Sequence, residues 1–275
     1  MNTISATVVA HSISDAGKEI CTLHVVMPRF ILPQFNTHRA FARNTRSSRA
    51  VPTKVVIDEV MNNPVVPLRW GVNKPGMQAA AEMGADTRAR ALRLWLKARD
   101  EAVSAVMQML DSPEPPHKQI VNRLLEPWMW AHTLVTATEW RNFFALRLHD
   151  DAQPEIQALA QAMRDAMDSS TPVFTPVGGW HRPYISGTWM DREDLRTANM
   201  VSAARCARVS YAPFDGSTDV LKEIARAEKL LMARPAHASP FEHIAFPYGD
   251  DEQGSGPFRG WGQWRALLPD NVVRG

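Results

Sequence analysis

The hydrophobic pattern of the first thirty residues is that of β-strands. Residues 3–11 and 20–27 are rich in Val, Ile and Thr, and a polar stretch at Ser14–Lys18 separates them. Short runs of β-branched residues that are bounded by turn residues favour extended backbone. The N-terminal part of the chain is therefore predicted to contain two strands joined by a turn.

A helical pattern dominates the middle of the chain. Residues 52–76 contain several Pro and Gly and predict an irregular connection, whereas residues 77–111 are rich in Ala, Leu, Met and Arg and predict a helix. The run PEPP at 113–116 ends this helix. A second helical region is predicted over 117–148, kinked at Pro127, and it includes the stretch WMWAHTLVTATEWRNFFALRL.

Helices and one long loop are also predicted in the C-terminal part. A third helix is predicted over 153–168, and residues 169–200 are rich in Pro, Gly and aromatic residues, which predicts an ordered loop. A short helix is predicted over SAARCARVS at 202–210, and a further helix begins at Thr218 or Asp219 as its cap. Because helix dominates and strands are present, the predicted fold class is α+β.

Composition and charge exclude several classes of protein. The chain has 275 residues, of which 45% are hydrophobic, and its formal net charge is +2. This balance is ordinary for a globular protein and too small for one that coats a nucleic acid polymer or a membrane. No apolar stretch approaches the roughly 20 residues that span a bilayer, and the N-terminus does not read as a signal peptide. Two cysteines, Cys21 and Cys206, provide neither a disulfide framework nor a zinc pattern, so a cytoplasmic setting is expected.

A dense row of arginines is the first candidate for chemistry. Residues 37–52 read THRAFARNTRSSRAVP, with Arg39, Arg43, Arg46 and Arg49 spaced four, three and three apart. In a helix these side chains would share one face and repel one another. A solvated basic face is one interpretation. The interleaved Ser and Thr residues favour another, in which the row binds phosphate groups.

The segment HASPFEH at 237–243 contains two histidines and a glutamate. Its spacing differs from that of HExxH and HxxEH, and Pro240 would interrupt a helix that aligned the three side chains, so no metal site is predicted. Ser239 followed by Pro240 and Glu242 instead predicts a helix start with a capping box. A helix start also offers N–H groups to a phosphate or an electron-rich ring.

Two weaker signals complete the set. ARVSY at 207–211 combines a basic residue with a serine and a tyrosine. Thr136 and Arg147 are eleven residues apart, which in one long helix would place them on the same face about 16 Å apart. Arg147 alone would also suit the end of a helix, where a cation favours the helix dipole.

Taken together, these motifs resemble the flavin-dependent thymidylate synthases. The family signature R-H-R-x-x-S-x-N-x-x-S-x-R corresponds to the stretch from Thr37 to Arg49, ARVSY and HASPFEH match further family motifs, and NFFALR followed by AQPEI matches another. The order of the motifs is permuted, because ARVSY and HASPFEH follow the arginine segment, as in a phage-type branch. The signature also departs at four positions, where this chain has Thr37, Ala42, Thr45 and Ala50.

The resemblance implies a single domain over residues 1–275, with helices packed on a mainly antiparallel sheet, and a homotetramer whose subunits share the active sites. It implies that Arg147 contacts the uracil ring and favours its ionised form, as the catalytic residue. The implied nucleotide contacts are Gln34, Ser47, Arg49, Arg123, Arg147 and Ser210. The implied contacts on the flavin side are Thr37, His38, Arg39, Thr136, Asn142, His237, Ser239 and Glu242.

The activity that the resemblance implies is methylation of deoxyuridylate (dUMP) at carbon-5. The carbon unit comes from methylenetetrahydrofolate, FAD carries out the reduction, and NADPH recharges the flavin, in the cytoplasm of a bacterium or a phage-infected cell. The four departures from the signature leave two alternatives open. One is hydroxymethylation or another carbon-5 modification of dUMP or deoxycytidylate, and the other is a relative that binds nucleotide or RNA without catalysis.

Overall fold

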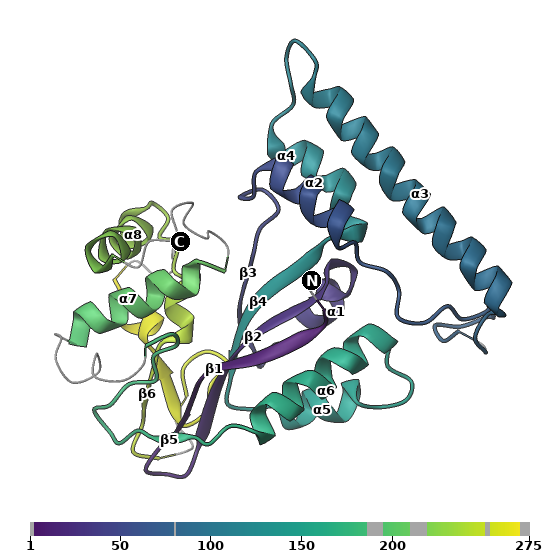
Figure 1. Ribbon diagram of the computed structural model, residues 1–275. Coiled ribbons are helices and arrows are strands. Elements are labelled where there is room, and N and C mark those ends of the chain that lie inside the picture. The colour runs from purple at the N-terminus through teal and green to yellow at the C-terminus, as the bar shows by residue number, and fades with distance from the viewer. Residues whose placement is uncertain (1–2, 80, 186–194, 210–218, 251–253, 270–275) are drawn as a thin grey trace.

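A five-stranded sheet organises the molecule (Figure 1). The computed structural model describes residues 3–79, 81–185, 195–209, 219–250 and 254–269. The strands are ordered β3-β4-β2-β1-β5, and every pairing is antiparallel except that between β1 and β5. Their bounds are β1 Ser5–Ile13, β2 Glu19–Pro28, β3 Ala42–Thr45, β4 Trp130–Ala137 and β5 Val173–Phe174.

The turn between β1 and β2 is tight. Ser14 and Lys18 are joined by a backbone hydrogen bond, and Gly17 adopts φ 73°, a left-handed conformation that glycine tolerates without steric cost. The two long strands then pair along nearly their whole length. This hairpin confirms the predicted pair of strands.

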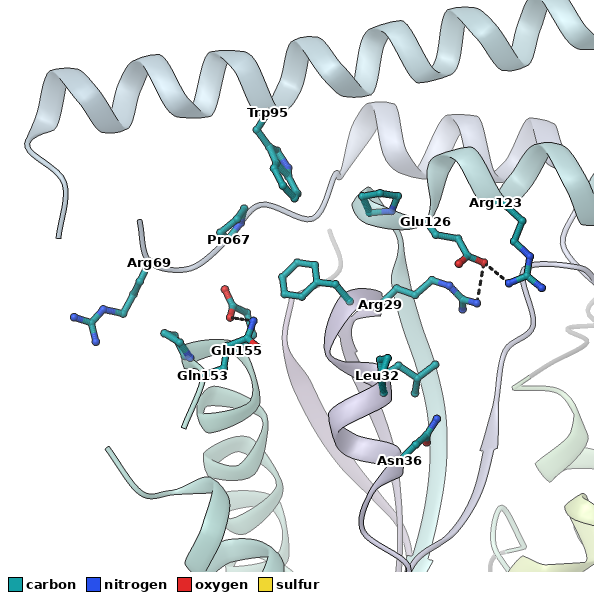
Figure 2. A pocket seen from close by; sticks show the side chains of 14 residues that line it. Arg29, Leu32, Asn36, Pro67, Arg69, Trp95, Arg123, Glu126, Gln153 and Glu155 are labelled. Atoms are coloured by element: carbon teal, nitrogen blue, oxygen red, sulfur yellow. Dashed lines mark hydrogen bonds and ion pairs between the residues drawn. The ribbon is translucent and has the colours of Figure 1, made fainter. Parts of the chain in front are cut away.

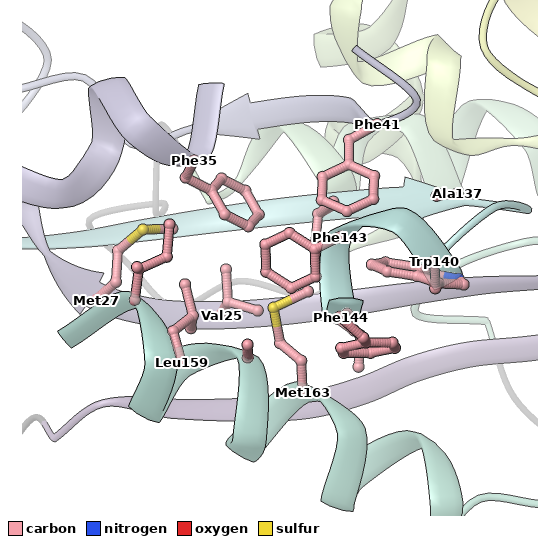
Figure 3. Close-up of a cluster of buried hydrophobic side chains, with 14 of the residues drawn as sticks. Val25, Met27, Phe35, Phe41, Ala137, Trp140, Phe143, Phe144, Leu159 and Met163 are labelled. Carbon is pink, nitrogen blue, oxygen red and sulfur yellow. The ribbon is translucent and has the colours of Figure 1, made fainter. Parts of the chain in front are cut away.

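Short helices cover one face of the sheet. The 3₁₀ turn η1 Arg29–Ile31 leads into α1 Leu32–Asn36, and α5 Arg141–Arg147 and α6 Pro154–Asp168 pack beside them. Buried rings from α1, α5 and the segment between α1 and β3 meet in the main core, as Figure 3 shows for Phe35, Phe41, Phe143 and Trp140.

Two further layers extend from the sheet. One is built from α2 Thr53–Asn62, α3 Ala85–Leu110, α4 Lys118–Val121 and the 3₁₀ helix η2 Asn122–Trp128, which share a separate hydrophobic cluster. The other is C-terminal and lies near the opposite end of the sheet from α3 in Figure 1. Its elements are α7 Leu195–Ala207, α8 Val220–Met232, η4 Ser239–His243, β6 Ala245–Pro247, β7 Trp261–Gln263 and η5 Trp264–Leu267.

The predicted fold class, α+β with helices on a mainly antiparallel sheet, is confirmed. The long helix is found as α3, the helix over 153–168 as α6, and Asp219 caps α8 through hydrogen bonds to the N–H groups of Leu221 and Lys222. Within the described residues, no helix is long and apolar enough to cross a membrane.

Several predicted elements are wrong. Residues 130–137 form the strand β4 and not a helix, and the segment 52–76 contains the helix α2. The arginine row, for which a helix was one possibility, is an extended segment followed by a turn. The predicted loop 169–200 includes the strand β5, and α7 begins at Leu195, earlier than the predicted 202.

Candidate functional site

The end of α1 and the helix α5 enclose a small pocket of about 190 Å³, called here the smaller pocket. Four residues that the resemblance places on the flavin side line it, namely Thr37, His38, Arg39 and Asn142, together with Arg147. The structure thus brings together five predicted site residues from two segments more than 100 residues apart in the sequence.

Arg147 is oriented by His38. Its Nε donates a hydrogen bond to Nε2 of His38 at 2.9 Å, and the His38 ring packs edge-on against Phe143 at 4.8 Å. An imidazole nitrogen can accept this bond only when the ring is neutral. Burial, with the nearby charges of Arg147 and Arg43, lowers the pKa of His38 to about 4, so the ring is neutral near pH 7. The guanidinium therefore has a fixed orientation at the pocket.

A second, larger pocket of about 770 Å³ lies beside α1 (Figure 2). This volume is within the range typical of small-molecule sites. Asn36 lines the larger pocket and Thr37 lines the smaller one, so the C-terminal end of α1 separates the two. The residues that line the larger pocket are Arg29, Phe30, Leu32, Pro33, Asn36, Pro67, Arg69, Trp95, Arg123, Glu126, Pro127, Gln153, Pro154 and Glu155.

Of the predicted nucleotide contacts, Arg123 lines the larger pocket and pairs with Glu126 at 2.9 Å. Gln34 does not line it, but its Nε2 donates to Oε1 of Gln153, which does, at 2.6 Å. Gln153 in turn donates to the buried carboxylate of Glu155. Gln34 is therefore connected to the wall of the larger pocket through one hydrogen bond.

Ser47 and Arg49 lie in the turn that follows β3. The side chain of Ser47 accepts a hydrogen bond from the N–H of Arg49, and Arg49 itself is exposed. Asn122, the residue before Arg123, donates to the carbonyl groups of Ser48 and Val51 and so holds this turn against η2. Ser47 and Arg49 are thus neighbours of the segment that carries Arg123.

The other two arginines of the row have structural partners. Arg43 donates to the carbonyl oxygens of Phe35, in α1, and of His38, just after it, and Arg46 contacts both carboxylate oxygens of Glu59 at 2.6 and 2.7 Å. Arg39 and Arg49 are exposed. The row is therefore divided between two residues that hold the backbone or α2 and two that face outward.

The HASPFEH segment forms the 3₁₀ helix η4. The predicted capping box is wrong, because the helix begins at Ser239, Ala238 is the N-cap residue, and no side chain caps it. His237 and Ser239 are exposed. Glu242 forms an ion pair with Arg265, and burial raises its pKa although Arg265 and Arg43 act in the opposite direction.

Thr136 lies in β4 and not in a helix with Arg147. Its side chain is fully buried, and its Oγ1 forms hydrogen bonds with Oγ1 of Thr22 at 2.6 Å and Nδ1 of His243 at 2.8 Å. Thr22 continues to His181, and His181 to Ser12. Thr136 therefore links the sheet to η4 in the interior of the protein, and it lines neither pocket.

The ARVSY motif is described only in part. Arg208 forms an ion pair with the buried Glu223 of α8, which Arg205 also contacts at 3.2 Å. Ser210, the predicted nucleotide contact, and Tyr211 lie outside the described residues. Cys21 and Cys206 are both buried, and burial raises the pKa of both thiols, that of Cys21 to about 12, so neither resembles an activated nucleophile.

Other residues around the larger pocket were not identified from the sequence. Arg29, Trp95 and Glu126 come from η1, α3 and η2, and each belongs to a run that reads as ordinary core or helix. Trp95 donates to the carbonyl of Val65 and so fixes the segment that closes one wall. Signals for this pocket came from Arg123, an implied nucleotide contact, and from the AQPEI motif, whose Gln153, Pro154 and Glu155 line it.

Comparisons with known proteins identify the family of this chain. A family model described as thymidylate synthase complementing protein matches residues 19–173, more than half of the chain, and no curated protein matches. Two solved structures of a UMP/dUMP methylase, PolB from Streptomyces cacaoi, are each 19% identical to this chain. The structure with 5-Br UMP has a TM-score of 0.48 and covers 61% of this chain and 89% of that one. The structure with 5-Br dUMP has a TM-score of 0.47 and covers 60% of this chain and 90% of that one.

The matched region contains all the residues that line both pockets. It contains none of the C-terminal motifs, because α7 and η4 follow it along the chain. Arg147, His38 and Arg123 all lie within it. The chain therefore belongs to the thymidylate synthase complementing protein family, the flavin-dependent thymidylate synthases, and is an enzyme of the methyltransferase type.

Proposed function

We propose that this enzyme methylates dUMP at carbon-5 to give thymidylate, with methylenetetrahydrofolate as the carbon donor, FAD as the redox cofactor and NADPH as the reductant. The observation that carries the proposal is the fixed Arg147 guanidinium at a pocket that four flavin-side residues line. A positioned cation of this kind stabilises negative charge that develops on a pyrimidine ring.

The donors around the smaller pocket fit a flavin nucleotide. Thr37 supplies a hydroxyl, Asn142 an amide and Arg39 a guanidinium, which are groups that bind phosphate oxygens and the polar edge of a ring. When bound, FAD supplies the reducing step. The protein side chains orient the two ligands, and Arg147 carries the positive charge that the reacting pyrimidine requires.

The larger pocket suits the nucleotide, and in the proposed homotetramer with shared active sites the Arg147 that contacts its ring comes from a neighbouring subunit, because Arg147 of the same chain lines the smaller pocket. Arg29 and Arg123 provide positive charge, Phe30 and Trp95 provide aromatic surface, and Gln153 provides an amide. A nucleoside monophosphate needs these three features, for the phosphate, the base plane and the base edge. This placement supports dUMP, which is also one of the two nucleotides in the name of the methylase PolB.

We further propose a homotetramer in which neighbouring copies complete the smaller pocket. Its volume of about 190 Å³ is below the ~300–1,000 Å³ of typical ligand sites, whereas its lining residues include exposed side chains that could face another subunit. Light scattering tests this directly, because one chain has a mass of 30.8 kDa.

The decisive experiment is an anaerobic incubation of the protein with FAD, NADPH, methylenetetrahydrofolate and either dUMP or deoxycytidylate, followed by mass analysis of the nucleotides. Thymidylate from dUMP would support the proposal. A hydroxymethylated product, or any product from deoxycytidylate, would replace it with a base-modifying activity. Failure to bind FAD together with retention of RNA would favour a non-catalytic binding protein.

A further inference from the structure

One carboxylate oxygen in the larger pocket receives three donors. Oε1 of Glu126 lies 2.9 Å from Nη2 of Arg29, 2.9 Å from Nη1 of Arg123 and 2.9 Å from Oγ of Ser48. Figure 2 shows the two arginines converging on this carboxylate at one end of the pocket. The three donors come from η1, η2 and the turn after β3, so the fold brings together groups from three separate segments.

The donors form a set that a phosphate oxygen also accepts. Two guanidinium groups and a hydroxyl that point at one position are the usual protein contacts of a phosphate. Arg29 is largely buried, with 16% of its side chain exposed, whereas 53% of the Arg123 side chain is exposed. One cation is thus held inside the protein and the other is accessible from solvent.

Glu126 neutralises part of this positive charge. Burial opposes its ionisation, but the hydrogen bonds and charges of Arg29, Ser48 and Arg123 outweigh burial and keep its pKa below the usual value. The carboxylate is therefore negative near pH 7, and its charge acts against any anion that approaches the same donors.

We propose that Arg29, Arg123 and Ser48 form the phosphate-binding site of the larger pocket, and that the Glu126 carboxylate occupies the phosphate position until a nucleotide displaces it. This inference rests on the proposed function for the identity of the nucleotide. In this arrangement Arg29 and Ser48 contact the phosphate. Glu126 competes with the phosphate for the same donors and so lowers the affinity of the protein for the nucleotide.

The rest of the pocket agrees with a nucleotide whose phosphate lies at this end. Phe30 and Trp95 line the pocket. Figure 2 shows Trp95 near Pro67, and Gln153 on the far side of the pocket from the pair Arg29 and Arg123. A base stacked on aromatic surface would then present its polar edge to an amide. The volume of about 770 Å³ accommodates a mononucleotide.

The test is calorimetric titration of the full-length protein and of Glu126→Gln with dUMP, deoxyuridine and FAD. Glutamine keeps an oxygen that can accept from an arginine but removes the charge. We expect Glu126→Gln to bind dUMP about ten-fold more tightly, as for the loss of one competing charged hydrogen bond, with deoxyuridine affinity unchanged. Arg29→Gln should weaken dUMP binding by about ten-fold or more and again leave deoxyuridine unaffected.

Glu59→Gln is the matched control. The Glu59 side chain is 28% exposed against 26% for Glu126, it pairs with the similarly buried Arg46, and it does not line the pocket. Its substitution should leave the ratio of dUMP to deoxyuridine affinity unchanged. Equal ratios in Glu126→Gln and Glu59→Gln would overturn the proposal, because Glu126 would then be a structural ion pair. Weaker dUMP binding by Glu126→Gln, or a change confined to FAD, would also overturn it.

These titrations distinguish the inference from the proposed function. A phosphate-dependent change in dUMP affinity would stand even if no thymidylate were formed. Conversely, an active synthase with an unchanged affinity ratio would keep the function and remove the assignment of Glu126 and Arg29.

Discussion

Replacing Thr136 with valine should separate η4 from the sheet while keeping the shape of the core. Thr136 links Thr22 of β2 to His243 of η4, and all three side chains are fully buried. Nε2 of His243 has no hydrogen-bond partner within the described structure, so Nδ1 makes the only side-chain bond of this ring. Valine removes that bond and leaves the whole imidazole unsatisfied.

The loss of this hydrogen bond determines the expected decrease in the free energy of unfolding. Removing one partner of a buried hydrogen bond and leaving the other unsatisfied costs roughly 1–3 kcal/mol, so the unfolding free energy should fall by about that amount. Burial lowers the pKa of His243 to about 3, so the ring cannot gain a compensating charge near neutral pH. Thr136→Ser should restore most of the loss, because it keeps the hydroxyl.

Thr133→Val provides the matched control. Thr133 is fully buried in the same strand and also bonds a threonine on the neighbouring strand, but its partner Thr45 is only half-buried, and solvent can replace the lost bond. This variant should cost about 0.5–1.5 kcal/mol. Urea unfolding followed by tryptophan fluorescence measures both values, and hydrogen exchange of peptides covering 239–245 should accelerate only in Thr136→Val. An equal or larger cost for Thr133→Val would refute the linking role of Thr136.

The remaining predictions concern Arg147, His38 and the cysteines. Arg147→Ala should lower kcat/KM for dUMP by about 100-fold or more while FAD stays bound, and Arg141→Ala on the same helix should not; unchanged turnover would remove Arg147 from the mechanism. Because the pKa of His38 in the folded protein is about 4, below its usual value near 6.5, protonation favours the unfolded state, and the contribution of His38 to stability should be lost as pH falls from about 6.5 to 4. His38→Gln should reduce the slope of this part of the stability profile, to which His24, His132, His181 and His243 also contribute, and an identical profile would exclude His38 as one of its sources. Both cysteines should resist a thiol reagent until the protein unfolds, and rapid labelling of the native enzyme would contradict their burial.

The sequence predicted the elements whose local pattern and tertiary environment agree. The β1–β2 hairpin has β-branched runs and a turn with Gly17, and α6 carries one apolar face that packs on the sheet. In both elements the spacing of the hydrophobic residues in the sequence matches the spacing of the positions that are buried in the structure. The Asp219 cap of α8 is equally local, because an aspartate can satisfy the first N–H groups of a helix by itself.

The strand β4 was misassigned because it is a central strand. Six of its eight residues are buried, so the run WAHTLVTA lacks the alternation that identifies a half-exposed strand. The helix α5 follows after three residues, and its pattern extends backward into the strand. Only the pairing of β4 with both β2 and β3 decides the extended conformation, and that pairing is not visible in the local sequence.

The resemblance named residues that the structure brings together only in part. Five predicted site residues, from the arginine signature and from NFFALR, line the smaller pocket, and their roles there are assigned by resemblance. The carboxylate that holds Arg29 and Arg123 was invisible, because Glu126 and Ser48 are ordinary residues until the fold places them within hydrogen-bonding distance. Contacts between residues that lie far apart in the sequence depend on the topology of the fold, and periodicity and motif spacing do not reveal that topology.

A buried chain of hydrogen bonds through Thr136 connects η4, which carries the HASPFEH motif, to the sheet. The bonds from Ser12 to His181, Thr22, Thr136 and His243 run from β1 across the sheet to η4. Burial keeps both histidines neutral, so each ring has one donor and one acceptor nitrogen for the bonds of this chain. Such a chain tolerates few alternative positions of η4. The segment that carries Ser239 and Glu242 is therefore held against the sheet by the bond between Thr136 and His243, in addition to its backbone connections.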